Sequence, residues 1–242
     1  MTHLYLIRHG EALSAIKGLI GDTGLSPLGI LQAERLRDRL AATKEIEPDV
    51  LIASTLPRAR QTAEIVAPAF GALPLLLDDE IQELRPGLAD GMTEEEYDKK
   101  YGFPDFTNNP FQVVAPEGEN WGQFMLRVGT ALDRIIREHE GKTIVLFCHG
   151  GIIDGSFLFF FRMSSLSVPP AGFYTRNTSI THWHRVTWKR RNDQESTRWR
   201  LINYNDAVHL YDIGTPERIA WHNLLKRPAS DGDRPTVPLE TE

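Results

Sequence analysis

Near the start of the chain stands Leu4-Tyr5-Leu6-Ile7-Arg8-His9-Gly10-Glu11, a short apolar run followed at once by an arginine, a histidine and a glycine. The apolar run is typical of a buried strand. Polar residues directly after such a strand lie at its carboxyl end, where open α/β sheets bind their ligands. A neutral imidazole can attack phosphorus, and a guanidinium offers donors that match phosphate oxygens. The stretch therefore indicates a phosphate site, although an ordinary loop containing Arg8 and His9 fits this segment equally well on its own.

Three further apolar runs, at 50–54, 73–77 and 143–147, have the length and composition of buried strands. Helical patterns separate them. Ser26 and Pro27 supply an N-cap and a proline for the first turn of a helix in which leucines recur near helical spacing. Strands that alternate with helices predict a mainly parallel sheet covered on both faces, a three-layer α/β/α sandwich. Two more helices are expected over 58–66 and from residue 121 onward.

The last third of the chain has a different pattern. Residues 179–188 and 197–204 are rich in β-branched and aromatic side chains, and we expect them to form a hairpin. The stretch from about residue 226 contains prolines and many charges, and we expect a loose, disordered tail. With 242 residues and 41% hydrophobic content, the chain has the size of one domain. We place this domain at 1–213 and a C-terminal extension at 214–242.

Composition excludes several classes of function. The formal net charge is −6 and the pI is near 5.8, whereas nucleic-acid and membrane-surface binders favour a basic excess. Cys148 is the only cysteine, so a disulfide framework and a cysteine-cluster metal site are excluded. The N-terminus lacks the pattern of a signal peptide, and the apolar run at 155–161 is too short to span a bilayer. We expect a cytoplasmic protein that binds neither nucleic acid nor membrane.

A second candidate phosphate ligand follows the strand expected at 50–54. The stretch 54–63, Ser-Thr-Leu-Pro-Arg-Ala-Arg-Gln-Thr-Ala, places Arg58 in the first turn of the next helix. A cation is unfavourable there because the helix macrodipole favours anions, so some compensation is expected, for example a bound phosphate. Arg60 fits a solvated helix face better.

A third candidate is Cys148-His149-Gly150-Gly151, where the run at 143–147 gives way to small residues. Glycines let backbone amides approach an anion, and His149 could donate to a phosphoryl oxygen, or could equally be a buried structural histidine. A cysteine phosphatase needs an arginine six positions after its cysteine, and that position is Asp154. The G-x-S-x-G motif of acyl hydrolases, the Walker-type phosphate loop and the HExxH zinc motif are all absent from the sequence.

In this order the motifs resemble the histidine phosphatase superfamily, branch 1, which is also called phosphoglycerate mutase-like. The similarity runs from residue 4 to about residue 210. Besides the three segments above, it is carried by the following stretches: Asp22 to Gln32, Glu83 to Gly91, Gly118-Glu119-Asn120 with Phe124 and Arg127, Asn177-Thr178-Ser179, and Asn205 to Leu210.

The resemblance implies a role for each matched residue. His9 would be the nucleophile, Arg8, Arg58 and His149 the phosphoryl pocket with Gly150 beside it, and Glu83 the proton donor. Phosphoryl transfer is catalysed mainly by positioning and electrostatics, so such a pocket needs no metal and no cofactor. His182 and His184 share one face of an expected strand, but a third metal ligand is missing from this motif.

We therefore expect a metal-independent phosphomonoester hydrolase that acts on a small phosphorylated metabolite through a phosphohistidine intermediate. Two alternatives stay open: a mutase of the same superfamily, and a non-catalytic phosphate-binding adaptor. The segment 92–117 is expected to be a lid that forms much of the wall over the leaving group. Its aromatic residues suggest a partly apolar alcohol, but they could equally pack the lid itself; they are Tyr97, Tyr101, Phe103, Phe106 and Phe111. Against a mutase, this segment contributes only Lys99 and Lys100 as cations. Ala15 and Ala89 depart from the family pattern and put the pocket shape in doubt; the sequence indicates neither the substrate nor an oligomeric state.

Overall fold

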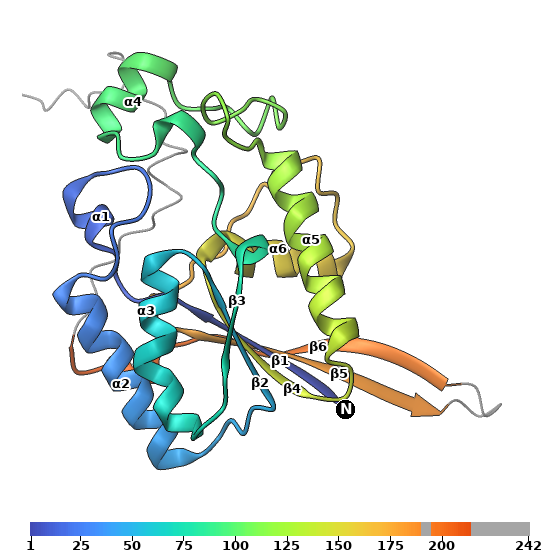
Figure 1. The fold of residues 1–242 in the computed structure, drawn as a ribbon. Coiled ribbons are helices and arrows are strands. Elements are labelled where there is room, and N and C mark those ends of the chain that lie inside the picture. Colours follow the sequence, from blue (N-terminus) through green and yellow to red (C-terminus); the bar gives the residue numbers. More distant parts are fainter. Residues whose placement is uncertain (190–194, 214–242) are drawn as a thin grey trace, which may run out of the picture.

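The computed structural model describes residues 1–189 and 195–213, and its centre is a six-stranded sheet in the order β3-β2-β4-β1-β5-β6 (Figure 1). The expected extension over 214–242 lies outside the described residues. The strands are β1 (Thr2–Arg8), β2 (Val50–Ser54), β3 (Leu75–Asp78), β4 (Thr143–Cys148), β5 (Ile180–Lys189) and β6 (Glu195–Asp206).

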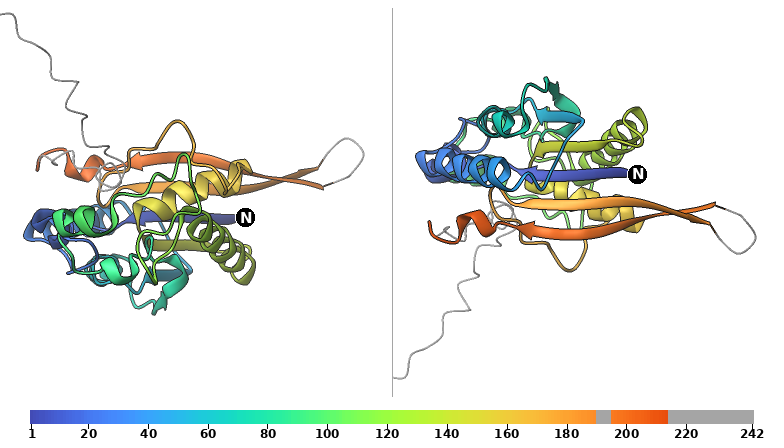
Figure 2. Two further views of the ribbon diagram at one scale, coloured as in Figure 1. Left: turned by 90° about the horizontal axis from the view of Figure 1, so that it is seen from above. Right: turned by 90° about the horizontal axis from the view of Figure 1, so that it is seen from below.

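The four strands β1 to β4 are parallel, with β1 next to β4, β4 next to β2 and β2 next to β3. Their carboxyl ends therefore lie along one edge of the sheet. β5 runs antiparallel to β1 and pairs with β6, which confirms the hairpin expected in the last third of the chain. The hairpin extends well past the other strands (Figure 2).

Local sequence signals set where the helices begin. The Ser26 side chain accepts a hydrogen bond from the Gly29 backbone, and Pro27 occupies the first position of α2. Asn120 and Gln123 form a capping box at the start of α5. The helices are α1 (Leu13–Lys17), α2 (Pro27–Thr43), α3 (Pro57–Val66), α4 (Glu94–Tyr101), α5 (Trp121–Glu138) and α6 (Gly150–Phe161), with short 3₁₀ turns η1 (Ala67–Phe70), η2 (Asp79–Ile81), η3 (Gly87–Ala89) and η4 (Val208–Leu210).

Two hydrophobic clusters, one on each face of the sheet, make the three-layer sandwich that the sequence predicts. On one face, Leu36 and Leu40 of α2 pack with Ala63 of α3 against β1, β2 and β4. On the other face, α5 and α6 pack through side chains such as Phe124 and Phe157. Burial of apolar side chains on both faces explains why β1, β2 and β4 read as continuous apolar runs. The buried strand expected at 73–77 is instead the edge strand β3, whose Leu76 and Leu77 are about half exposed.

Two short elements lie at the end of the molecule toward which β1 runs. α1 follows β1 after a short loop, and α4 lies beside α1 (Figure 1). An isolated β-bridge between Leu19 and Thr93 joins the segment after α1 to the residue before α4. Thr93 and Glu96 form a capping box that begins α4. Within residues 1–189 and 195–213, no helix is both long and apolar enough to cross a membrane.

Candidate active site

The carboxyl ends of all four parallel strands supply residues to one site. His9 follows β1, Arg58 lies in the first turn of the helix after β2, Glu83 follows β3 by a short turn, and His149 follows β4. Because neighbouring parallel strands end at the same edge, segments far apart in the sequence meet there. The structure thus brings the sequence-predicted site residues together.

His9 is buried, and its two ring nitrogens have different partners. Nδ1 lies 2.6 Å from the carbonyl oxygen of Gly10, and Nε2 lies 3.0 Å from Nε of Arg58. A carbonyl only accepts and a guanidinium only donates, so the proton is on Nδ1 and Nε2 has its lone pair available. Burial, and after it the charges of Arg58 and Arg8, hold the pKa of His9 well below its usual value. These contacts and the lowered pKa favour a neutral imidazole with Nε2 as its unprotonated nitrogen.

Arg58 is held by an aspartate that the sequence analysis did not single out as its partner. Asp22 lies 3.0 Å from Nη1 of Arg58 and also accepts the Arg58 backbone N–H, and both side chains are nearly buried. The Asp22 carboxylate thus supplies the negative charge that the N-terminus of α3 favours. The expected compensation is present within the chain itself.

Arg8, the residue before His9, lines the same cavity. The buried guanidinium donates from Nη1 to the Thr175 carbonyl, while Nε has no hydrogen-bond partner among the described residues. Burial lowers the pKa of Arg8, yet an arginine stays charged. A buried guanidinium whose Nε–H has no partner among the described residues is suited to bind an anion.

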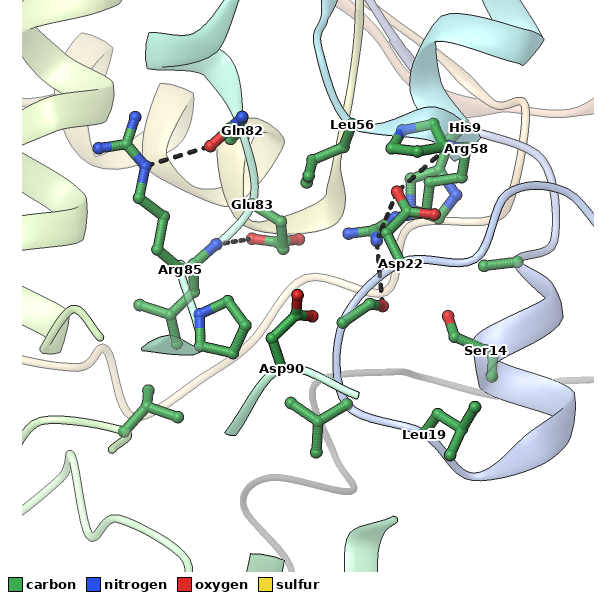
Figure 3. A pocket seen from close by; sticks show the side chains of 18 of the residues that line it. His9, Ser14, Leu19, Asp22, Leu56, Arg58, Gln82, Glu83, Arg85 and Asp90 are labelled. Carbon is green, nitrogen blue, oxygen red and sulfur yellow. Dashed lines mark hydrogen bonds and ion pairs between the residues drawn. The ribbon is translucent and has the colours of Figure 1, made fainter. Parts of the chain in front are cut away.

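Glu83 contacts the N-terminal end of α6. One carboxylate oxygen accepts the Gly151 backbone N–H at 3.1 Å, and the other accepts the N–H of Leu84 at 3.1 Å. The side chain is turned into the same cavity as His9 and Arg58 (Figure 3). Glu83 thus places a carboxyl group in the wall of the cavity that His9 and Arg58 also line.

His149 is fully buried behind His9. Its Nε2 lies 2.8 Å from the hydroxyl of Ser54, and the centroids of the two imidazole rings are 5.2 Å apart. Burial, and then the nearby Arg58, lower its pKa well below the usual value. Its Nδ1 has no partner among the described residues. Neither His149 nor Gly150 is among the residues that line the cavity, so both stand behind its wall rather than on it.

The segment that carries Glu83 is held by a buried ion pair. Arg127 of α5 donates to the carbonyl oxygens of Glu80, Gln82 and Glu83 at 2.7, 2.9 and 3.2 Å. The same guanidinium forms two hydrogen bonds to Glu119, at 2.7 and 2.6 Å. Three backbone contacts to one rigid side chain fix the position of this segment, and Arg127 and Glu119 are therefore positioning residues.

A cavity of about 540 Å³ opens above these groups. At its floor lie Arg8, His9 and Arg58, and Glu83 forms part of its wall. The expected lid contributes less than the sequence suggested: of its five aromatic residues, Phe103 lines the cavity, whereas Tyr97 and Phe106 are buried in the core. Tyr97 and Phe106 therefore fit the alternative that aromatic residues of this segment pack the lid itself, whereas Phe111 is exposed.

The cysteine and the two strand histidines that the sequence analysis considered do not belong to this cavity. Burial raises the pKa of the Cys148 thiol, which keeps it protonated. His182 and His184 both stack with His3, and His3 Nδ1 lies 3.0 Å from His182 Nε2. Among residues 1–189 and 195–213, no group of three or more His, Cys, Asp or Glu side chains is arranged to hold a metal ion.

Comparison with known proteins decides the family. The family model for the histidine phosphatase superfamily (branch 1) matches residues 4–201. The chain belongs to this superfamily. Among histidine phosphatase relatives, the phosphoglycerate mutase-like protein 4 of Arabidopsis thaliana is 34% identical over 159 residues, which are 63% of this chain and 68% of the relative. The metal-independent phosphoserine phosphatase of the same plant is 27% identical over 225 residues, covering 90% and 87%.

A solved histidine phosphatase structure shares the fold. A phosphoserine phosphatase variant from Entamoeba histolytica, in complex with phosphoserine, has a TM-score of 0.66 and 26% identity. The match covers 87% of this chain and 100% of that chain. The resemblance found in the sequence and the predicted α/β sandwich are both confirmed.

Proposed function

We propose that this chain hydrolyses phosphomonoesters of small metabolites through a phosphohistidine on Nε2 of His9. The observation that carries the proposal is the state of that atom, an unprotonated nitrogen that accepts the Nε–H of the buried Arg58. The phosphatase relatives support the reaction class. The roles assigned below to Arg8, Arg58, Glu83 and His149 are part of the same proposal.

In the first step, His9 Nε2 attacks the phosphorus atom and the bond from phosphorus to the alcohol oxygen breaks. Arg8 and Arg58 neutralise the charge that spreads over the phosphoryl oxygens. The hydrogen bond from Arg58 Nε to the His9 ring breaks, and the same N–H donates to a phosphoryl oxygen instead. Glu83 in its protonated form gives its proton to the departing alkoxide, so the product is a neutral alcohol.

In the second step, water attacks the phosphohistidine and the nitrogen–phosphorus bond breaks. The Glu83 carboxylate, left by the first step, takes a proton from the attacking water. Inorganic phosphate leaves, and His9 and Glu83 return to their starting states. His149, hydrogen-bonded to Ser54, supports the pocket from behind.

One structural observation favours hydrolysis over a mutase reaction. Lys99 and Lys100, the cations of the segment 92–117, line a separate hollow with Asp90 and Glu96 instead of the cavity above His9. A bisphosphorylated intermediate would need cations at both ends of the cavity. We propose in addition that 1–213 forms the catalytic domain, with 92–117 as a lid, and that the protein is cytoplasmic.

The function is tested by phosphate release from p-nitrophenyl phosphate and from a panel of metabolite phosphates. We expect turnover by the purified chain and none by His9→Ala, with chelators leaving the rate unchanged. A folded wild-type protein without turnover on any ester would favour the adaptor, and interconversion of phosphoglycerates without net phosphate release would favour the mutase.

A further inference from the structure

The cavity has a second end, beyond the phosphoryl site, where the alcohol part of the substrate must lie. Apolar side chains from the loop and helix after β1 form one wall there, and apolar residues from the Glu83 segment and the lid form the opposite wall. These residues are Ala15, Ile16, Leu19, Ile20, Leu84, Pro86, Phe103 and Val114. The surroundings suit an alcohol with apolar surface.

An acidic side chain also faces this end. Asp90 turns its carboxylate into the space between Glu83 and Asp22 (Figure 3). The carboxylate packs directly over Gly21, where a Cβ atom would come within 1.9 Å of Asp90 Oδ1. Gly21 has a φ of +101°, a conformation that glycine adopts without strain. The backbone is therefore shaped so that the carboxylate lies beside the loop that holds Arg58.

Within the cavity itself, the described lining residues place no free cation beside this charge. Among the described residues that line the cavity, Arg85 is the one cation outside the phosphoryl site. Its guanidinium is turned away from Asp90 (Figure 3) and is held by Gln82, by the Asp79 carbonyl and by Glu80. Lys99 and Lys100 of α4 line the second hollow, whose wall Asp90 also forms, and neither lysine is among the residues that line the cavity above His9.

We propose that the substrate is a monoester of a partly apolar alcohol that carries no second anionic group, neither a carboxylate nor another phosphate. This inference rests on the proposed function, because it concerns the leaving group of that reaction. A second anion would meet the Asp90 carboxylate in a partly enclosed space without a countercharge, and like charges disfavour binding there. A hydroxyl or an ammonium group at the same position meets an acceptor. Asp90 is thus a specificity-determining residue that rejects anionic alcohols.

Two pairs of substrates isolate the contribution of a single carboxylate. Phosphoethanolamine and phosphoserine differ by one carboxylate, as do glycerol 3-phosphate and 3-phosphoglycerate, in which it replaces a hydroxymethyl group. In each pair we expect kcat/KM to be about tenfold higher for the member without the carboxylate. Because the ratio is taken within a pair, changes in overall turnover cancel.

Variants at Asp90 connect this preference to the structure. Asp90→Asn should bring the ratio within each pair toward one, and Asp90→Lys should reverse it. Asp98→Asn, an exposed acid on α4 that does not line the cavity, is the matched control and should leave the ratio unchanged. Circular dichroism and the rate on p-nitrophenyl phosphate establish that each variant is folded.

The outcomes separate this inference from the function on which it rests. A wild-type preference for the carboxylated member of both pairs, or a preference that Asp90→Asn leaves intact, overturns the inference while the phosphatase function stands. Loss of all turnover, including that on p-nitrophenyl phosphate, by the folded wild-type protein overturns both.

Discussion

Arg58 Nε donates a hydrogen bond to Nε2 of His9 across 3.0 Å. This contact orients the imidazole and marks Nε2 as its unprotonated nitrogen, but it also occupies the lone pair that would attack phosphorus. A phosphoryl group that enters the site offers Arg58 a charged acceptor in place of the ring, and charge-assisted hydrogen bonds are stronger than neutral ones. Under the proposed function, we therefore expect substrate binding to free the nucleophilic nitrogen.

Replacing Arg58 tests this relationship. Arg58→Ala should lower kcat/KM by about 10²- to 10³-fold, because a donor to the developing phosphoryl charge is lost. Arg58→Lys should recover part of the loss, since a lysine keeps the charge but not the planar donor pair. Arg60→Ala is the matched control: Arg60 lies on the same helix, is half exposed, and pairs with Glu64 on the surface. Equal losses in the Arg58 and Arg60 variants would contradict the assignment.

Glu83 should affect the rate according to the leaving group. Glu83→Gln keeps the size of the side chain but removes the transferable proton, so an alkyl phosphate should lose about two to four powers of ten in the phosphorylation step. p-Nitrophenyl phosphate should lose much less, because its phenolate leaves without a proton. Single-turnover measurements are needed, since the same carboxylate acts in the second step. Equal losses on both esters would assign Glu83 a structural role and make Asp90 the next acid to test.

Asp154 couples stability to pH. Burial, and after it the charge of Glu83, raise the pKa of this carboxyl from 3.8 to about 8, and its Oδ1 has no hydrogen-bond partner among the described residues. The folded state thus holds a proton that the unfolded state releases near pH 3.8, so the free energy of unfolding should fall as pH rises through this window toward about 8.

The isosteric Asp154→Asn variant mimics the protonated carboxyl and should remove this pH dependence. Its midpoint of thermal unfolding should exceed that of the wild type by more at about pH 8.5 than at about pH 5. Asp98→Asn serves as the exposed control. A midpoint difference that stays constant across this range would show that Asp154 has an ordinary pKa.

The contacts of Arg127 with Glu119 and with the segment that carries Glu83 should contribute to both stability and catalysis. Arg127→Ala leaves Glu119 without its cation and three carbonyls without a donor, so we expect a loss of about 3–5 kcal/mol in the free energy of unfolding. Arg134→Ala, on the same helix but with its side chain 42% exposed, should cost less than about 1 kcal/mol.

Whether Arg127 also positions Glu83 for catalysis is tested by comparing turnover of two kinds of ester. Arg127→Lys, if folded, should lower kcat on alkyl phosphates more than on p-nitrophenyl phosphate, as expected when the proton donor is misplaced. A uniform loss on both esters would mean that Arg127 supports the fold without positioning Glu83.

Much of the fold was predictable from local signals. The strand over 50–54 was predicted with its observed bounds because a fully buried strand leaves an uninterrupted apolar run. The start of α2 was predictable because an N-cap serine and a proline at the first helical position act locally, and Ser26 and Pro27 take these two positions. The parallel arrangement followed from the alternation of strands and helices, and it implied that residues after successive strands would meet at one edge.

Features that depend on packing were not predictable from the sequence. Asp22 pairs with Arg58 across 36 residues, and the segment between them contains a whole helix and a strand. The lid aromatics carry no sign of which side they face, and Tyr97 lies buried with its hydroxyl donating to the Val114 carbonyl. The tautomer of His9 follows only from the identity of both ring partners.

The site and chemistry of the covalent intermediate test the central claim most directly. Glu83→Gln, mixed with p-nitrophenyl phosphate and quenched in alkali, should accumulate a phosphohistidine, because the phenolate leaves unaided while attack by water loses its base. Peptide mass spectrometry and phosphorus NMR should place the phosphate on Nε2 of His9, the nitrogen that faces Arg58, and His9→Ala should carry no label. Phosphate on Nδ1, on His149 or on Cys148, with Nε2 of His9 unmodified, would contradict the account.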